Sequence, residues 1–125
     1  MIAVDASSLI AYFQGEIAPD TDRIADALGT RELVLPPPVL VELIGRVTTA
    51  AAFDEIANGA AQLPIGPGFW LRARQNRSLI LSKGLKARAL DSLIAQCCID
   101  ANVPLIARDA DYRHFSRWCG LKLAL

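Results

Sequence analysis

The stretch RALDSLIAQCCIDANVPLIARDAD, residues 88–111, decides the fold more than any other part of the chain. Apolar side chains recur at helical spacing in its first half, so one face of a helix is expected to point into a core. Asn102 suits the left-handed C-terminal cap of that helix, and Pro104 prevents the helix from continuing. The apolar run 103–107 is then typical of a parallel strand buried on both faces. The apolar helix face consists of Leu90, Leu93, Ile94, Cys97, Cys98 and Ala101.

Short apolar runs alternate with helical patterns along the whole chain. This alternation predicts one α/β domain over residues 1–125, with a mostly parallel sheet and helices on both faces. Pro64 makes the third strand an edge strand or a marginal one, because proline cannot donate to a ladder. The core side of helix 69–82 is expected to carry Trp70, Leu71, Leu79 and Ile80. The predicted strands are 2–4, 32–35, 63–65, 103–107 and 121–125, and the other helices are 8–13, 20–28, 39–47, 48–58, 90–101 and 111–118.

The composition is that of a folded protein, because 53% of the residues are hydrophobic and 21% are charged. No signal peptide is visible, and glycine and proline interrupt the longest uncharged stretch, 56–71, so no membrane span is expected. The odd set Cys97, Cys98 and Cys119 fits no disulfide framework, and its spacing to His114 fits no common zinc pattern. These features predict a cytoplasmic protein without membrane association.

The chain has no formal net charge, but its charges are unevenly distributed. Acids outnumber bases up to Leu71, and bases outnumber acids from Arg72 onward. A basic flank of this kind can bind a polyanion such as RNA, although ordinary solvated helix faces explain the same pattern equally well. The candidate phosphate contacts are Arg72, Arg74, Arg77, Lys83, Lys86 and Arg88.

Four acids stand at positions that suit a functional site. Asp5 ends the first strand and Asp109 follows the strand 103–107, so both are expected at the same edge of a parallel sheet. Glu42 and Asp91 lie near helix starts and can reach that edge. Carboxylates crowded in this way repel one another, and a divalent cation relieves the repulsion. Hard oxygen ligands suit Mg²⁺ or Mn²⁺, which can activate water for attack on a phosphodiester.

Each acid also has a structural alternative. Asp5 can cap the following helix, and Glu42 can pair with Arg46 one helical turn later. Asp91 can be a favourable acid at a helix start, and Asp109 can cap the helical turn 111–118. Asp111 is expected to be structural, because it can cap that same turn.

The segment MIAVDASSLIAYF resembles the start of PIN-domain ribonucleases, especially VapC-type toxins, in which an aspartate ends the first strand before a small polar residue. The resemblance continues through Glu42 in VLVELIGR, Asp91 in RALDSLIAQCC and Asp109 in VPLIARDADYRHF, and so spans nearly the whole chain. One departure is Ala107, which occupies a place that often holds Thr, Ser or Asn. A supporting hydrogen bond near the metal is therefore expected to be missing.

The resemblance implies a PIN-like α/β domain with a five-stranded parallel sheet and Mg²⁺-dependent (or Mn²⁺-dependent) endoribonuclease activity. It implies that Asp5, Glu42, Asp91 and Asp109 are the catalytic, metal-binding residues. It further implies a homodimer and a small cognate antitoxin of a VapBC-type pair, whose tail enters the acidic groove. The predicted contacts with the RNA substrate are Ser7, Lys86, Arg88 and Arg108.

Other classes of protein fit the sequence less well. A haloacid-dehalogenase-like, metal-dependent phosphatase wants a second acid two positions after the strand-end aspartate, where this chain has Ser7. A receiver domain needs an acid pair at the first strand, where only Asp5 stands. A non-catalytic α/β interaction module remains open, because fold does not fix function. An antitoxin helix is expected to dock on apolar N-terminal side chains, namely Leu9, Ile10, Phe13, Leu40 and Leu43.

Overall fold

A computed structural model of the chain describes residues 1–43 and 49–125, and within them leaves out the side chains of Phe53 and Ala57. Its centre is a parallel sheet with the strand order β3-β2-β1-β4. The strands are short and the two central ones are wholly buried; they are β1 (Ile2–Val4), β2 (Leu33–Leu35), β3 (Ala61–Gln62) and β4 (Leu105–Ile106). The α/β class and the parallel sheet predicted from the alternating patterns are confirmed.

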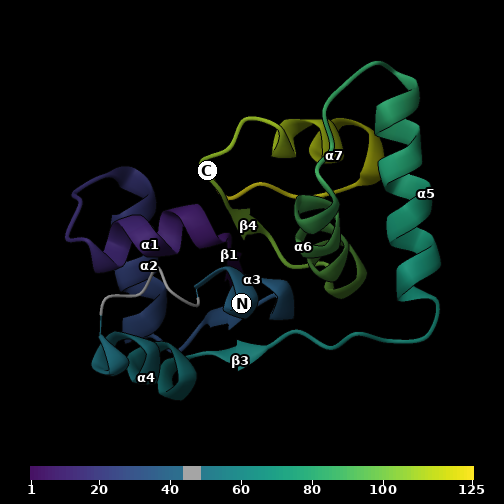
Figure 1. Ribbon diagram of the computed structural model, residues 1–125. Coiled ribbons are helices and arrows are strands. Elements are labelled where there is room, and N and C mark those ends of the chain that lie inside the picture. The colour runs from purple at the N-terminus through teal and green to yellow at the C-terminus, as the bar shows by residue number, and fades with distance from the viewer. Residues whose placement is uncertain (44–48) are drawn as a thin grey trace.

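Helices connect the strands and cover the sheet. In Figure 1, α1, α2 and α4 lie to one side of the strands, and α5, α6 and α7 lie to the other. This division follows from the strand order. The chain moves in one direction across the sheet from β1 through β2 to β3, and it then returns past both strands to β4 on the other side of β1. The helices of these two parts of the chain therefore lie on opposite sides. The helices are α1 (Ala6–Phe13), α2 (Pro19–Gly29), α3 (Pro37–Leu43), α4 (Ala50–Gly59), α5 (Phe69–Ser82), α6 (Ala89–Ala101) and α7 (Tyr112–Cys119).

The helix and strand predicted from residues 88–111 are α6 and β4. Asn102 has the left-handed conformation (φ 54°, ψ 45°) expected of a C-terminal cap. The Val103 amide donates to the Cys98 carbonyl (3.0 Å), which closes the end of the helix. The chain then enters β4, where Leu105 and Ile106 are fully buried beside β1. This short connection places the start of α6 and the residues after β4 at the same end of the fold.

Three of the predicted strands differ from the structure, and the strand expected at 103–107 is shortened to Leu105–Ile106. β3 lies at Ala61–Gln62 and not at 63–65, because the Leu63 amide makes the last ladder bond to Leu35 (2.8 Å) and Pro64 has no N–H to continue it. Among the described residues the sheet has four strands, and the predicted fifth strand is reduced to a single parallel bridge between Leu123 and Leu105. Among the described residues, this segment pairs with β4, which has just two residues.

The predicted core side of α5 is wrong for three of its four residues. Ile80 is buried as expected, but Trp70 and Leu71 are 63% and 66% exposed, and Leu79 is exposed too. The buried stripe of α5 is instead Phe69, Ala73 and Ile80. On α3, Leu43 is buried and Leu40 is partly buried, whereas Ile44 and Val47 lie outside the described residues.

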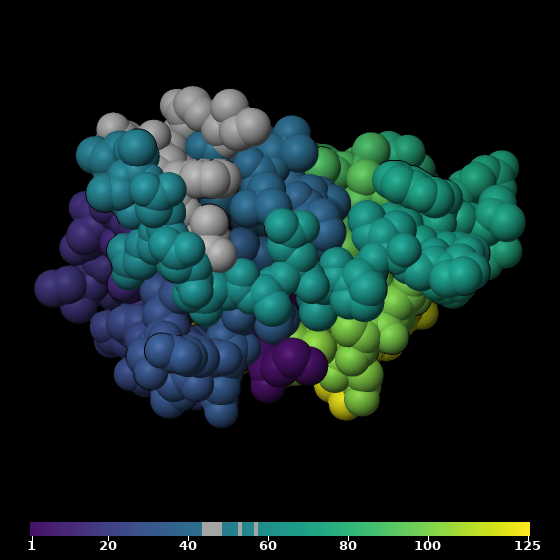
Figure 2. Space-filling view, turned by 90° about the horizontal axis from the view of Figure 1, so that it is seen from below, coloured from purple at the N-terminus to yellow at the C-terminus, as the bar shows by residue number. Residues whose placement is uncertain are grey.

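A polar network fixes α5 against α6. Arg72 of α5 forms a bidentate salt bridge with the Asp100 carboxylate of α6, with N···O distances of 3.0 and 2.7 Å. The Gln96 side chain donates to the same carboxylate (2.8 Å) and accepts a hydrogen bond from Asn76 (2.7 Å). These bonds hold the two helices in a defined relative position. Figure 2 shows α4 and α5 at opposite ends of the molecule, with the segment between them crossing its surface.

None of the helices in the described part of the chain is long and apolar enough to cross a membrane.

Candidate active site

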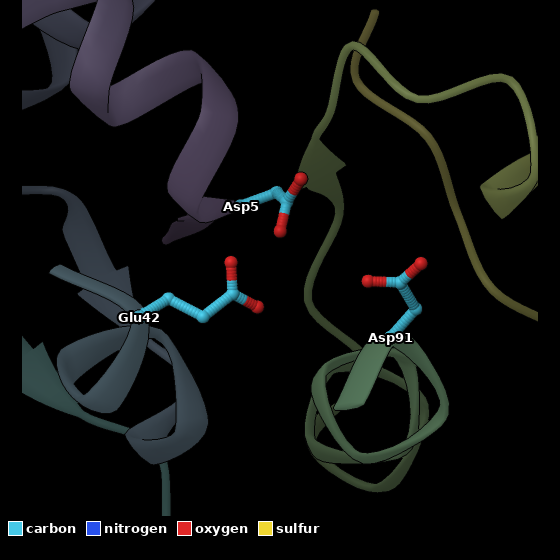
Figure 3. A group of neighbouring side chains, drawn as sticks. All are labelled: Asp5, Glu42 and Asp91. Carbon is cyan, nitrogen blue, oxygen red and sulfur yellow. The ribbon is translucent and has the colours of Figure 1, made fainter. Parts of the chain in front are cut away.

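Three acids from three different elements meet at the end of the sheet where β1 and β4 end. Asp5 follows β1, Glu42 lies on α3 and Asp91 lies in the first turn of α6. One carboxylate oxygen from each lies within 4.8 Å of the others. Figure 3 shows the three carboxyl groups pointing into one shared space. The structure thus brings together three of the four acids that the sequence placed at this edge, and Asp109 is not part of the group.

Asp5 is held by hydrogen bonds on both of its oxygens. The Ser7 hydroxyl donates to Oδ2 (2.9 Å), and the Tyr112 hydroxyl donates to Oδ1 (2.9 Å). Asp5 occupies the N-cap position of α1 but makes no side-chain capping bond there. The capping alternative is therefore wrong for Asp5, whose carboxylate faces the other acids instead.

The Asp91 carboxylate is partly buried and lies near other negative charges. Burial raises its pKa above the ordinary value, and the charges of Asp5 and Asp109 raise it further. Tyr112 donates to Oδ1 at 3.3 Å, whereas Oδ2 is buried without a hydrogen-bond partner among the described residues. A buried, unpartnered carboxylate oxygen beside two other carboxylates is a strong indication of a cation ligand.

The residue that sequence reasoning missed is Tyr112 of α7. Its ring is buried and its hydroxyl lies between Asp5 and Asp91, closer to Asp5. Burial raises the pKa of Tyr112 above its usual range, and the charges of Asp5 and Asp91 add to this, so the hydroxyl remains a donor. The only signal in the sequence is that Tyr112 follows Asp109 and Asp111 at the start of a helix.

Asp109 lies close to this cluster but is not one of its three members. Its Oδ1 accepts the backbone N–H of Asp111 (2.9 Å), so Asp109 does fix the turn that leads into α7. Its charge still contributes to the raised pKa of Asp91, which places it within electrostatic reach of the site. Asp111 makes no side-chain capping bond and lies 3.8 Å from the His114 imidazole.

The three clustered acids fit a hard divalent cation. The donor set consists of carboxylate oxygens alone, which suits Mg²⁺ or Mn²⁺ better than zinc. Asp91 Oδ2 has no other partner among the described residues, and a cation would supply one. Arg46, the proposed structural partner of Glu42, lies outside the described residues.

Of the four predicted substrate contacts, Ser7, Lys86 and Arg88 have exposed side chains. Arg88 lines a hollow of about 320 Å³ together with Glu42, Leu90 and Asp91, which we call the acid hollow. Lys86 is exposed nearby in the chain, and Ser7 is exposed but donates to Asp5.

Arg108 has its side chain engaged within the protein. It donates to both oxygens of Asp20 and to Glu16 (3.0 Å), so it ties the segment after β4 to α2 and the loop before it. These bonds hold the pKa of Asp20 below its ordinary value. Ala107, where a polar side chain was expected, has no side-chain donor. Within the described residues, the side-chain donors to Asp5 are Ser7 and Tyr112.

Comparison with known proteins gives the same picture of the fold. The structure resembles VapBC2 from Rickettsia felis bound to a DNA fragment from its promoter, with a TM-score of 0.77, 18% identity, and coverage of 98% of this chain and 97% of that chain. It also resembles FitAcB from Neisseria gonorrhoeae, with a TM-score of 0.71, 14% identity, and coverage of 98% and 96%. A comparison with curated protein sequences finds no match.

The family model for the PIN domain matches residues 2–117. That span contains every strand, all three clustered acids and nearly all of α7. The short parallel sheet and the carboxylates gathered at its end thus occur in a chain that belongs to the PIN-domain family.

Proposed function

We propose that this protein is a Mg²⁺- or Mn²⁺-dependent endoribonuclease and the toxin of a VapBC-type toxin–antitoxin pair. The observation that carries the proposal is the meeting of Asp5, Glu42 and Asp91, with Asp91 Oδ2 buried and without a partner in the described part of the chain. Membership of the PIN-domain family supports a nuclease, and the similarity to VapBC2 and FitAcB supports a toxin.

Asp5, Glu42 and Asp91 would hold the cation. When bound, it would supply an activated water and neutralise charge on the phosphodiester. Ser7 and Tyr112 orient Asp5, so its carboxylate is fixed before any ligand arrives. Asp109 is proposed to act at the edge of the site, where its charge already affects Asp91.

Arg88 is the most favourably placed cation for the substrate. It lies in the acid hollow beside Glu42 and Asp91, so a phosphate brought to the carboxylates would also meet its guanidinium. Lys86 extends the positive charge along the segment before α6. These side chains are proposed to offset the repulsion between the acids and the RNA backbone.

The proposed antitoxin would inhibit by placing an Arg or Lys against the three carboxylates. The apolar surface predicted for its helix needs correction, because Leu9 and Leu43 are fully buried. Ile10, Phe13 and Leu40 are partly buried against the core and keep some exposed surface. Expression of the chain alone should slow growth, and co-expression with the adjacent small open reading frame should restore it. If the protein cleaves RNA in vitro but is harmless when expressed alone at a high level, the toxin assignment fails and the nuclease stands.

The nuclease is tested by cleavage of a 5′-labelled single-stranded RNA with and without Mg²⁺ or Mn²⁺. Asp5→Asn should abolish metal-dependent cleavage while the fold survives, because it removes one repelling charge along with a ligand. The matched control is Asp22→Asn, the same substitution at an exposed position of α2. Equal cleavage by folded Asp5→Asn and wild-type protein would refute the proposal.

The same preparation separates the two alternatives. A metal-dependent phosphatase would release phosphate from a monoester without cutting the RNA. This is less favoured because the position two residues after Asp5 holds Ser7, whose hydroxyl already donates to Asp5. A non-catalytic interaction module would show neither activity, and no stabilisation by either metal.

A further inference from the structure

A second hollow lies between α5 and α6. Its volume is about 370 Å³, and we call it the α5–α6 groove. The Arg72–Asp100 and Asn76–Gln96 contacts hold its two helices together, so its walls are fixed. It is lined on α5 by Trp70, Ala73, Arg74, Arg77, Ser78 and Leu81, and on α6 by Ala89, Ser92 and Leu93.

Trp70 offers a large aromatic surface at this groove. Its indole contacts the buried ring of Phe69 edge-on, with ring centroids 5.1 Å apart and planes at 83°. The side chain is anchored in this way, yet most of its surface is exposed to solvent. An anchored, exposed aromatic ring is a platform on which a nucleobase can stack.

The charge of the groove distinguishes a polyanion from other occupants. Arg74 makes no hydrogen bond or ion pair with any described residue, and Arg77 uses only Nε, which donates to the Ala87 carbonyl (2.8 Å). No acid among the described residues lines the groove. Two copies of this chain joined through this surface would bring like charges together, which opposes association, whereas a phosphate backbone would neutralise them.

Two other cations of this region are engaged elsewhere. Arg72 is paired with Asp100, and Lys83 lies over the Trp118 ring, 5.0 Å from its centroid. The six basic residues grouped in the sequence therefore differ in role. Arg72 and Lys83 are engaged within the protein, and Arg88 lines the acid hollow while Lys86 is exposed before α6. Arg74 and Arg77 are those that can contact a ligand there.

Both the groove and the acid hollow are lined by residues at the start of α6. Arg88, Leu90 and Asp91 line the acid hollow, while Ala89 and Ser92 line the groove. We propose that the α5–α6 groove is a subsite for single-stranded RNA, in which a base stacks on Trp70 while Arg74 and Arg77 contact neighbouring phosphates. This inference rests on the proposed function, because it extends the same substrate from the carboxylates to α5.

The test uses the two tryptophans of the chain. Trp118→Phe leaves Trp70 as the only indole, and an unlabelled uridine oligonucleotide is then titrated in EDTA so that no cleavage occurs. Stacking should quench the fluorescence of Trp70. In wild-type background, anisotropy of a labelled oligonucleotide should show Trp70→Ala weakening the affinity by roughly 5- to 150-fold, with Trp70→Phe much closer to wild type.

Arginine substitutions test the charged part of the subsite. Arg74→Gln should lower RNA affinity and reduce the slope of log affinity against log salt by about 0.7. Arg23→Gln, at an exposed position of α2, is the matched control and should change neither.

Unchanged affinity in folded Trp70→Ala, with no quenching in Trp118→Phe, overturns the subsite. A dimer that Trp70→Ala converts to a monomer, with RNA affinity intact, also overturns it and assigns the surface to a second copy. Because binding is measured without metal, the outcome is separate from that of the nuclease test. If RNA binds through Trp70 but is never cleaved, the subsite is supported and the nuclease is refuted. If RNA is cleaved and Trp70→Ala changes neither its binding nor its cleavage, the nuclease is supported and the subsite is refuted.

Discussion

At the residue scale, the site depends on a tyrosine hydroxyl as well as on carboxylates. Tyr112 donates to Asp5 at 2.9 Å and lies 3.3 Å from Asp91, so it fixes two proposed metal ligands from outside the coordination sphere. Partners of this kind orient ligands, and their loss typically lowers metal affinity or activity by about 10- to 100-fold.

Tyr112→Phe is therefore expected to weaken Mn²⁺ binding by roughly 10-fold or more, measured by calorimetry, while the fold is retained. The control is Tyr12→Phe, which removes a hydroxyl whose hydrogen-bond partner, among the described residues, is Glu55 on the surface. If both variants bind Mn²⁺ like the wild type, Tyr112 has no positioning role.

The raised pKa of Asp91 predicts how the metal-free protein responds to pH. A carboxyl group whose pKa is higher in the folded state binds more protons there than in the unfolded state. Its contribution to stability therefore falls as pH rises from the ordinary aspartate pKa through the raised value. In EDTA, Asp91→Asn should abolish this loss, so the free energy of unfolding of the variant relative to wild type should rise as the pH increases above about 4, the ordinary aspartate pKa. A difference that does not vary with pH would contradict the assignment.

At the element scale, Arg108 connects parts of the fold that are far apart in the sequence. It lies 88 positions from Asp20, whose side chain is nearly buried, and it joins the segment after β4 to α2. Replacing one partner leaves the other carboxylate or guanidinium unsatisfied, and hydrogen bonds to charged groups contribute about 1.5–3 kcal/mol each in favourable cases.

Arg108→Gln should lower the free energy of unfolding by about 1–3 kcal/mol, since the guanidinium is partly exposed and its interactions are screened by solvent. Urea denaturation of this variant is compared with Arg113→Gln, an exposed arginine of α7. Wild-type stability with weakened RNA binding would instead assign Arg108 to the substrate, as the sequence first suggested.

The helices and strands also show how much of the fold could be predicted from the sequence. Val103–Pro104 and the Asn102 cap determine the helix–strand pair of residues 88–111 locally. The order of helix, cap and strand is confirmed, although the strand covers only Leu105–Ile106 of the predicted 103–107. The phase of α5 could not be read in the same way, because apolar residues occur on every side of its first and last turns. Only packing against α6 and α7 decides that Phe69 is buried and Trp70 exposed.

At the scale of the whole molecule, the parallel sheet explains why the clustering of acids was predictable. Asp5 follows a strand, and the carboxyl ends of parallel strands lie at one edge of the sheet. A residue that directly follows a strand can therefore be placed at that edge from the sequence alone. Tyr112 was not predictable, because its contact with Asp5 spans 107 positions and depends on how α7 packs. The pairing of Arg108 with Asp20 was missed for the same reason.

A homodimer remains a prediction, and light scattering of the purified chain measures it directly. The predicted mass is twice the 13.5 kDa of one chain. Exposed Leu71 and Val41 are available for such contact. A mass of one chain at micromolar concentration would contradict a stable dimer.

Thermal unfolding with and without Mn²⁺ measures directly whether Asp5, Glu42 and Asp91 form a divalent-metal site. A ligand at 100 times its dissociation constant stabilises the native state by about 2.7 kcal/mol, so wild type and Asp22→Asn should melt several degrees higher with Mn²⁺ than in EDTA. Asp91→Asn should lose most of this shift, because it replaces the ligand whose Oδ2 has no other partner in the described part of the chain. An equal shift in folded Asp91→Asn, or none in the wild type, would contradict the account.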